Sequence, residues 1–263
     1  MVAPEGFVEL RRGSGFGWVT AELAEVGTEP FWGELLPLEG VKGRGGVGVL
    51  TVAGRELVVR PCRRGGALGR LLEDRYVSSR RVRHEIETLI GLRAEGVPAV
   101  LPIAAVARRH GVYWRMRLCT ERVVDAAPLP AFMAAHPELR RVTAEAVGTL
   151  LRLAFAAGLR HPDLHLDNVI CASRGDLVRA LLVDLDRARL QKPLAQGDID
   201  AMLVRMARYI VRHQRKLAAV PTRCECLRLL RALGLSRAAR KETFLRLDQK
   251  LRRALGRRRW LGR

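Results

Sequence analysis

The chain has 263 residues, of which 48% are hydrophobic, and it carries a formal net charge of +20. This length allows one large domain or two lobes with separate cores, and this hydrophobic content excludes a disordered chain. No apolar run reaches the roughly 18 residues that a membrane-spanning helix needs, and the first residues lack the pattern of a signal peptide. The five cysteines form no C-x-x-C pair, so we expect neither a disulfide framework nor a zinc site. We therefore expect a cytoplasmic location.

Positive charge is concentrated near the C-terminal end, where residues 201–263 hold 19 Lys and Arg against three acidic residues. A basic segment of this size favours an anionic partner, such as nucleic acid, an acidic membrane surface or a phosphorylated substrate. Only five of the 47 basic residues are lysines, so a general preference for arginine on solvated helix faces explains the charge equally well.

The first half of the chain is rich in glycine and in short segments typical of strands. Residues 46–60 predict a hairpin that turns at Ala53 and Gly54, and residues 104–123 predict a second hairpin. Between the two hairpins, residues 81–96 predict a helix, because apolar residues recur there at helical spacing.

The second half is mainly helical. Residues 137–158 predict a long helix, and residues 197–260 predict further helices that are interrupted at Pro221. Between these helices, residues 168–172 and 180–186 predict two short strands joined by a turn. A β-rich first half is thus followed by a helical second half, with a polar loop at residues 161–168 near the junction.

A G-x-G-x-x-G pattern in the first half indicates a loop that could approach phosphate groups closely. Its glycines are Gly43, Gly45 and Gly48. Glycines allow backbone N–H groups to reach phosphate oxygens, although a plain hairpin turn fits this pattern equally well. Arg60 ends the strand that follows, and could hold nucleotide phosphates if a helix carboxylate oriented it. Glu85 is the best candidate for that carboxylate, and Glu87 is the alternative.

The polar loop has the sequence HPDLHLDN and contains the pattern H-x-D-x-x-x-x-N. Phosphoryl transfer needs a carboxylate that receives a hydroxyl proton, and oxygen ligands that hold Mg²⁺ on the phosphates. Asp163 is the candidate base, Asn168 offers an amide oxygen to the metal, and Asp184 follows the next strand as the anionic ligand. His161 is expected to hydrogen-bond the loop backbone. His165 faces substrate, metal or solvent, and these alternatives stay open.

Each of these features alone fits a turn or a capping residue. Together, in this order, they predict a protein-kinase-like fold of the α+β class. We expect an N-lobe of residues 1–122 with the glycine-rich loop, and a C-lobe of residues 123–263 with the catalytic loop and the basic helical end.

Several collinear segments resemble one family more specifically. They are GRGG, GRELVVRPCRRGG, LLEDRYV, HEIETLIGLRAEGVP, LCTERV, HPDLHLDN and LLVDLDRARL, and they extend from about Gly43 to Leu190. The chain resembles the bacterial lipopolysaccharide kinases, and among these the 3-deoxy-D-manno-octulosonic acid (Kdo) kinases. This resemblance implies ATP-dependent phosphorylation of a sugar hydroxyl on the inner core of lipopolysaccharide, at the cytoplasmic face of the inner membrane.

The resemblance also implies roles for individual residues. Asp163 would be the catalytic base, Asn168 and Asp184 would bind Mg²⁺, and Arg60 would pair with Glu85.

In the same way, Glu121 and Arg122 would lie beside adenine, and Arg63 and Arg64 would face phosphates of the nucleotide or the acceptor. Two departures stand out. Protein kinases use lysine where Arg60 stands, and arginine is not the same compact point charge. The loop segment from His165 to Asp167 also differs from the usual family pattern.

The implied partners are Kdo-lipid A and an anionic inner-membrane surface. The segment 244–260 could lie on that surface as an amphipathic helix, or could pack its leucines on the C-lobe. Three other functions remain as alternatives. The chain could be an aminoglycoside- or choline-type kinase, or a pseudokinase. A nucleic-acid-binding protein is disfavoured, because only 5% of the residues are aromatic and few bases could stack.

Overall fold

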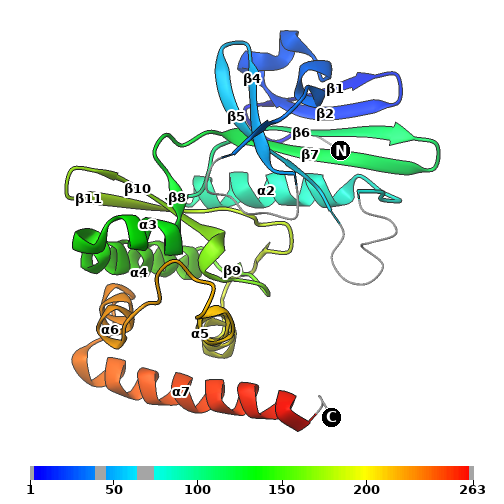
Figure 1. The fold of residues 1–263 in the computed structure, drawn as a ribbon. Helices are drawn as coiled ribbons and strands as arrows, with labels where there is room; N and C mark the ends of the chain where they lie inside the picture. The colour runs from blue at the N-terminus through cyan, green and yellow to red at the C-terminus, as the bar shows by residue number, and fades with distance from the viewer. Residues whose placement is uncertain (1–2, 39–45, 64–73, 261–263) are drawn as a thin grey trace. The chain divides into compact units, whose positions relative to one another are not determined.

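The computed structural model describes residues 3–38, 46–63 and 74–260, which form two compact units (Figure 1). Unit 1 comprises Met1–Gly91 and Val100–Val123, and unit 2 comprises Leu92–Ala99 and Val124–Arg263. The segment Leu92–Ala99 groups with unit 2 because the N–H group of Leu182 donates to the carbonyl of Pro98 at 3.0 Å.

Unit 1 is built on one antiparallel sheet of seven strands, in the order β1-β2-β6-β7-β5-β4-β3 (Figure 1). The strands are β1 (Phe7–Arg12), β2 (Gly15–Thr20), β3 (Leu36–Pro37), β4 (Gly48–Val52), β5 (Arg55–Pro61), β6 (Pro102–His110) and β7 (Tyr113–Glu121). Both predicted hairpins are confirmed. The first closes at Ala53 and Gly54, whose φ values of 48° and 78° give the left-handed pair that a tight hairpin turn requires.

The two faces of this sheet are covered differently. Helix α2 (Arg80–Ala94) confirms the helix predicted over residues 81–96, and its Glu85 reaches Arg60 of β5. The other face carries the hydrophobic core of unit 1 under two short 3-10 helices, η1 (Ala21–Val26) and η2 (Glu29–Trp32). Successive strand residues point to opposite faces, so each side chain of β7 belongs to one of these two environments.

Unit 2 consists mainly of helices. They are α3 (Leu129–Ala135), α4 (Arg140–Ala156), α5 (Gln196–His213), α6 (Arg223–Ala232) and α7 (Arg237–Trp260), with the 3-10 turns η3 (Pro137–Leu139) and η4 (Leu166–Asn168). Strand β10 (Val169–Arg174) pairs with β11 (Leu177–Leu182) on one side and with β8 (Ala127–Pro128) on the other, and β9 (Leu159–Arg160) pairs with β12 (Arg189–Leu190). The predicted helices of this half are therefore present, with the expected break at Pro221 between α5 and α6. The strand predicted over residues 168–172 corresponds to β10, whereas the one predicted over residues 180–186 overlaps β11 only at residues 180–182.

Glycine allows α4 and α6 to approach each other closely. A Cβ atom on Gly148 of α4 would lie 2.5 Å from the carbonyl oxygen of Leu229 and 2.6 Å from the Cβ of Ala232. No real side chain tolerates such distances, so the contact between the two helices depends on this glycine.

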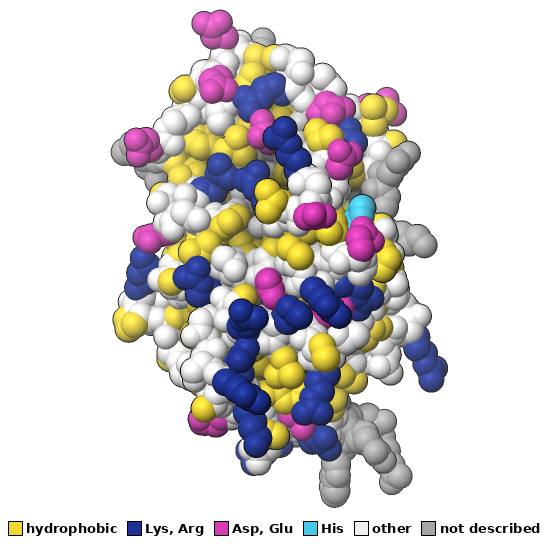
Figure 2. Space-filling view, turned by 90° about the vertical axis from the view of Figure 1, so that its left-hand side faces the viewer, with side chains coloured by type: hydrophobic (Ala, Val, Ile, Leu, Met, Phe, Trp, Pro, Cys, Tyr) yellow, Lys and Arg dark blue, Asp and Glu magenta, His cyan; other side chains and the backbone are white. Residues whose placement is uncertain are grey.

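The long C-terminal helix α7 is attached to α5 by a buried carboxylate. Asp200 of α5 is 2% exposed and accepts hydrogen bonds from Arg246 at 2.9 Å and from Lys250 at 2.5 Å. Two basic residues of α7, Arg246 and Lys250, thus form ion pairs within unit 2. Other Lys and Arg side chains gather on the surface over the C-terminal helices (Figure 2). In the described part of the chain, no helix is both long and apolar enough to cross a membrane.

Candidate active site

His161 fixes the backbone of the polar loop. It is 2% exposed, its Nδ1 accepts a hydrogen bond from the N–H group of Asp163 at 3.1 Å, and its Nε2 donates to the carbonyl of Asp184 at 3.0 Å. Burial lowers the pKa of His161 below its ordinary 6.5, which favours the neutral ring. Since Nδ1 accepts a hydrogen bond, the proton resides on Nε2. The expected backbone-bonding role of His161 is confirmed.

Asp163 is held by a helix that follows it in the chain. Its carboxylate forms an ion pair with Arg205 of α5, and both side chains are partly exposed, at 39% and 35%. One turn further along α5, the hydroxyl of Tyr209 donates to the carboxylate of Asp167. The ring of Tyr209 also stacks on His165, with 4.6 Å between centroids and an interplanar angle of 16°. One face of α5 therefore contacts three side chains of the polar loop.

Asn168 closes the loop from within. It is 2% exposed, and its Oδ1 accepts a hydrogen bond from the N–H group of His165 at 2.7 Å. Its backbone carbonyl accepts a second bond from the N–H group of Val183 at 2.9 Å, which ties the loop to the segment after β11. An amide oxygen has two lone pairs, so Oδ1 retains one for a further ligand.

Asp184 adopts a backbone conformation that is uncommon for a residue with a side chain. Its φ is 57°, in the left-handed region, and its side chain is exposed. Such a conformation costs roughly 1 kcal/mol or more, and residues that adopt it are enriched at functional sites as well as in turns. The carboxylate of Asp184 and the amide oxygen of Asn168 are both hard oxygen donors, the kind of ligand that Mg²⁺ prefers. The donor types of these two residues therefore fit Mg²⁺.

In unit 1, Arg60 of β5 forms an ion pair with Glu85 of α2. The side chain of Glu85 is fully buried, whereas that of Arg60 is 23% exposed. Glu87, the alternative partner, is exposed two residues further along the helix. The expected pairing of Arg60 with Glu85 is confirmed.

The predicted glycine-rich loop is described only at its end. Gly43, Gly45 and Arg64 lie outside the described residues. Gly48 begins β4, where an added Cβ would lie 2.5 Å from the carbonyl oxygen of Leu36 and 2.7 Å from the Cβ of Leu35. Packing alone therefore requires glycine at position 48, because the chain at Leu35 and Leu36 passes too close for any side chain.

Two other predicted residues have partners within unit 1. Glu121 ends β7 and accepts a hydrogen bond from Arg55 at 2.7 Å. Arg122 pairs with Glu56 at 3.0 Å. Arg63 is exposed, and one of its guanidinium nitrogens would lie 3.4 Å from a Cβ on Gly46. Arg63 thus lies near the end of the glycine-rich segment.

Sequence reasoning missed Arg205 and Tyr209. Both lie on α5, about 40 residues after the loop, and nothing in a helical pattern says which exposed face contacts a distant loop. The available signal is their spacing of four residues, which places both side chains on one face of the helix.

The β-rich unit with its Arg60–Glu85 pair and the helical unit with Asp163, Asn168 and Asp184 carry the parts of a protein-kinase-like phosphotransferase. The family model of the lipopolysaccharide kinase (Kdo/WaaP) family matches residues 33–230, and the chain belongs to this family. It is accordingly a phosphotransferase with a sugar hydroxyl group as acceptor.

Individual relatives agree with this family. A 3-deoxy-D-manno-octulosonic acid kinase of Xylella fastidiosa is 29% identical over 212 residues, which cover 78% of this chain and 82% of the relative. The kinase of the same name from Vibrio parahaemolyticus is 28% identical over 185 residues, which cover 66% and 76%. The solved structure described as WaaP in complex with acyl carrier protein is similar in fold, with a TM-score of 0.57, 19% identity, and coverage of 86% of this chain and 90% of that one. The expected kinase-like fold is confirmed.

Proposed function

We propose that the enzyme transfers the γ-phosphoryl group of ATP to a hydroxyl of the Kdo sugar on Kdo-lipid A. The observation that carries this proposal is the fixed position of Asp163, held by its backbone bond to His161 and by its ion pair with Arg205. The names of the curated relatives support Kdo as the acceptor sugar.

Asp163 would act as the base of the reaction. Its carboxylate accepts the proton of the acceptor hydroxyl while the hydroxyl oxygen attacks the γ-phosphorus, and the bond from that phosphorus to the bridging oxygen of ADP breaks. Arg205 orients the carboxylate and leaves one oxygen for the hydroxyl. Asn168 and Asp184 would hold Mg²⁺, which offsets the negative charge of the phosphates when it is bound.

Unit 1 would supply contacts to ATP. The guanidinium of Arg60, oriented by Glu85, would contact the phosphates. Backbone N–H groups at Gly43, Gly45 and Gly48 would approach them closely. Glu121 would lie beside the adenine, and Arg63 and Arg64 would face phosphates.

A lipid-anchored acceptor implies that the enzyme works at a membrane surface. We propose a peripheral position at the cytoplasmic face of the inner membrane, and the net charge of +20 supports attraction to anionic lipid. The ion pairs of Arg246 and Lys250 with Asp200 engage these two residues of α7 within unit 2, while 33% and 42% of their side chains stay exposed.

Transfer of ³²P from γ-labelled Mg-ATP to Kdo-lipid A tests the proposal, with Asp163→Asn compared with Asp176→Asn. Asp176 is an exposed carboxylate in the turn between β10 and β11, so its variant makes the same chemical change away from the site. We expect label in the glycolipid with wild type and Asp176→Asn, and a loss of 100-fold or more with Asp163→Asn. Absence of label in Kdo-lipid A, while ATP binding is intact, would exclude this acceptor.

The same assay separates the alternative functions. Phosphorylation of a free aminoglycoside or choline, but not of the glycolipid, would indicate a small-molecule kinase. ATP binding without any transfer would indicate a pseudokinase.

A further inference from the structure

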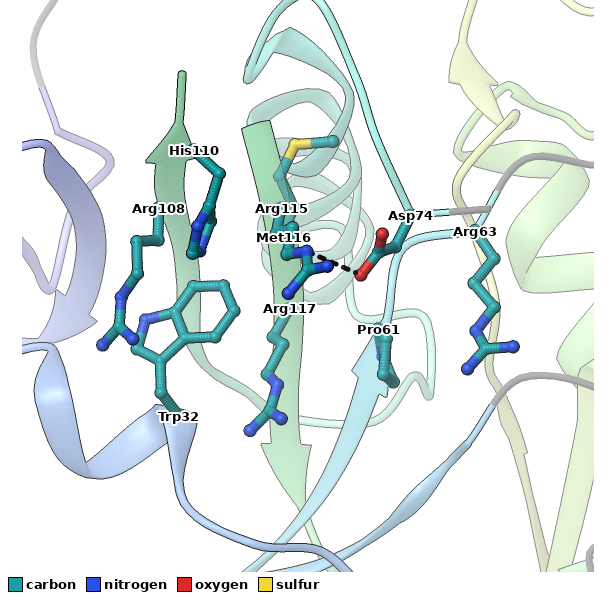
Figure 3. Close-up of a pocket in the computed structure, with 9 residues that line it drawn as sticks. All are labelled: Trp32, Pro61, Arg63, Asp74, Arg108, His110, Arg115, Met116 and Arg117. Carbon is teal, nitrogen blue, oxygen red and sulfur yellow. Dashed lines mark ion pairs between the residues drawn. The ribbon is translucent and has the colours of Figure 1, made fainter. Parts of the chain in front are cut away.

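A cationic hollow of about 360 Å³ lies on unit 1 (Figure 3). Four arginines line it together with His110 and one carboxylate, and these arginines are Arg63, Arg108, Arg115 and Arg117. The volume is within the range of small-molecule sites.

Strand alternation places the hollow on the face of the sheet opposite α2. Arg60, which reaches Glu85 of α2, pairs in register with Leu118 of β7, so Leu118 points to the α2 face. Arg115 and Arg117 lie at odd spacing from Leu118 and therefore point to the other face. Apart from Arg63, which also lies near the glycine-rich segment, the residues that line the hollow are not among those proposed to bind ATP in unit 1.

The positive charges of these arginines lie close together, which costs electrostatic free energy. Arg108 and Arg115 are directly opposite in the register of β6 and β7, an arrangement that destabilises a sheet when both charges have the same sign. Arg117 follows two residues after Arg115 and adds a third positive charge to the same face. A feature that costs folding free energy in this way is expected at a functional site.

The existing carboxylate partners only partly neutralise the cluster. Asp74 pairs with Arg115 at 3.1 Å, and Glu29 pairs with Arg108 at 2.5 Å. The paired side chains are between 32% and 58% exposed, so these are solvent-accessible ion pairs of the kind that exchange partners easily. Among the described residues, no carboxylate is paired with Arg117.

Contacts with Trp32 and with backbone carbonyls hold the guanidinium groups of Arg108 and Arg117 in positions where they can bind an anion. Trp32 lies between Arg108 and Arg117 in Figure 3, with their guanidinium carbons 4.8 and 5.2 Å from its ring centroid. Arg117 also donates to the carbonyls of Phe31 at 3.1 Å and Gly33 at 2.9 Å, which fixes its position. Burial lowers the pKa of Arg117, because the group has lost part of its water, and a bound anion would replace that water.

We propose that this hollow is a binding site for a phosphate monoester, separate from the catalytic site. Arg108 and Arg115 bind the phosphate oxygens through the planar, two-pronged contacts that guanidinium groups favour, and Asp74 competes with the ligand for Arg115. Two sources share this chemistry, a lipid phosphate headgroup and a soluble sugar or polyol phosphate.

Binding measurements on the full chain test the proposal with two probes. Isothermal titration calorimetry uses glycerol 3-phosphate. Vesicle sedimentation compares phosphatidylcholine vesicles with vesicles that also contain phosphatidic acid. The variants are Arg115→Gln and the control Arg109→Gln, which removes the same charge from an exposed neighbour on β6 that does not line the hollow.

Arg115→Gln is expected to weaken binding about ten-fold, whereas Arg109→Gln changes it less than two-fold. Asp74→Asn is expected to tighten binding several-fold, because the competing carboxylate is gone. A merely structural role of the Asp74–Arg115 pair would not give this increase. Far-UV circular dichroism and melting temperatures confirm that the variants are folded.

The two probes identify the source of the phosphate. Specific binding of both, with the same loss in Arg115→Gln, indicates a lipid headgroup, and binding of glycerol 3-phosphate alone indicates a soluble ligand. Equal losses in Arg115→Gln and Arg109→Gln would overturn the proposal, because they would show attraction to the net charge of the chain. Binding of neither probe would overturn it as well.

Discussion

Arg205 of α5 and Asp163 of the polar loop form an ion pair across 42 positions of sequence. The pair joins the proposed base to a helix that lies outside the polar loop in sequence. Because both side chains are partly exposed, water can reach the carboxylate, and so can an acceptor hydroxyl. Arg205 is therefore placed to orient Asp163 without enclosing it.

Replacing Arg205 with glutamine should lower kcat about 10- to 100-fold and leave the KM for ATP within about three-fold. The physical reason is that a carboxylate without its orienting cation samples directions that do not face the acceptor. Steady-state kinetics on the glycolipid measures both constants. Arg215→Gln, at an exposed position just after the same helix, is the control and should retain wild-type values. A rise in KM alone would contradict a positioning role and indicate direct substrate binding.

The partner of Arg60 gives a second prediction. Glu85→Gln keeps the shape of the buried side chain but removes its charge, and should raise the KM for ATP about ten-fold and destabilise the protein by about 2 kcal/mol. Glu87→Gln makes the same change at the exposed neighbour and should alter neither. ATP titrations and urea unfolding provide the measurements. Identical behaviour of the two variants would refute the assigned pairing role.

Two helical glycines should respond in opposite directions to alanine. Gly148→Ala drives a Cβ into Leu229 and Ala232 of α6, and should destabilise the protein by about 1–3 kcal/mol. Gly197→Ala, at an exposed position of α5 with nothing within 4 Å of the added Cβ, should stabilise it by about 0.5 kcal/mol. Thermal unfolding distinguishes the two signs. A stable Gly148→Ala variant would mean that α6 moves away from α4 at little cost.

Stability should depend on pH through Glu225. Hydrogen bonds from Arg140, at 2.7 and 2.9 Å, lower the pKa of Glu225 below its ordinary 4.5, although burial alone would raise it. The folded state thus favours the ionised form. The stabilisation is complete above about pH 4.5 and is lost as the pH falls through the lowered pKa of the folded state.

Glu225→Gln should therefore cost about 1.5–3 kcal/mol at pH 7, and this difference from wild type should shrink toward pH 3. Urea denaturation at a series of pH values measures it. The control is Glu242→Gln, a carboxylate on α7 whose side chain is 80% exposed, and it should show little difference at any pH. A gap between Glu225→Gln and wild type that stayed constant across this range would argue against an electrostatic origin.

Most of the regular structure could be predicted from the sequence because its signals are local. The turn at Ala53 and Gly54, the helix that carries Glu85 and the break at Pro221 each follow from residues that are close together in the chain. The first strand pair, β1 and β2, was not predicted. In the structure, Gly13 has a φ of 54° at the turn between these strands.

The site was predictable where residue types are fixed by chemistry and not where they depend on packing. Asp163 and Asn168 share one short motif, and the Arg60–Glu85 pair follows from a strand followed by a helix. Arg205 and Tyr209 reach the loop only through the way α5 packs in unit 2, which no short segment encodes. The cationic hollow was missed for a similar reason, since its arginines come together through the register of β6 and β7.

Asp200 connects the C-terminal helix α7 to α5, the helix that contacts the polar loop. Helix α5 contacts the polar loop through Arg205 and Tyr209, and it contacts α7 through Asp200, whose two cations come from Arg246 and Lys250. A chain cut before α7 would lack both cations and the helix that covers Asp200, so α5 would lose these ion pairs and gain contact with solvent. Because the same helix contacts the polar loop, a loss of activity in such a truncated chain would not by itself locate the defect in that loop.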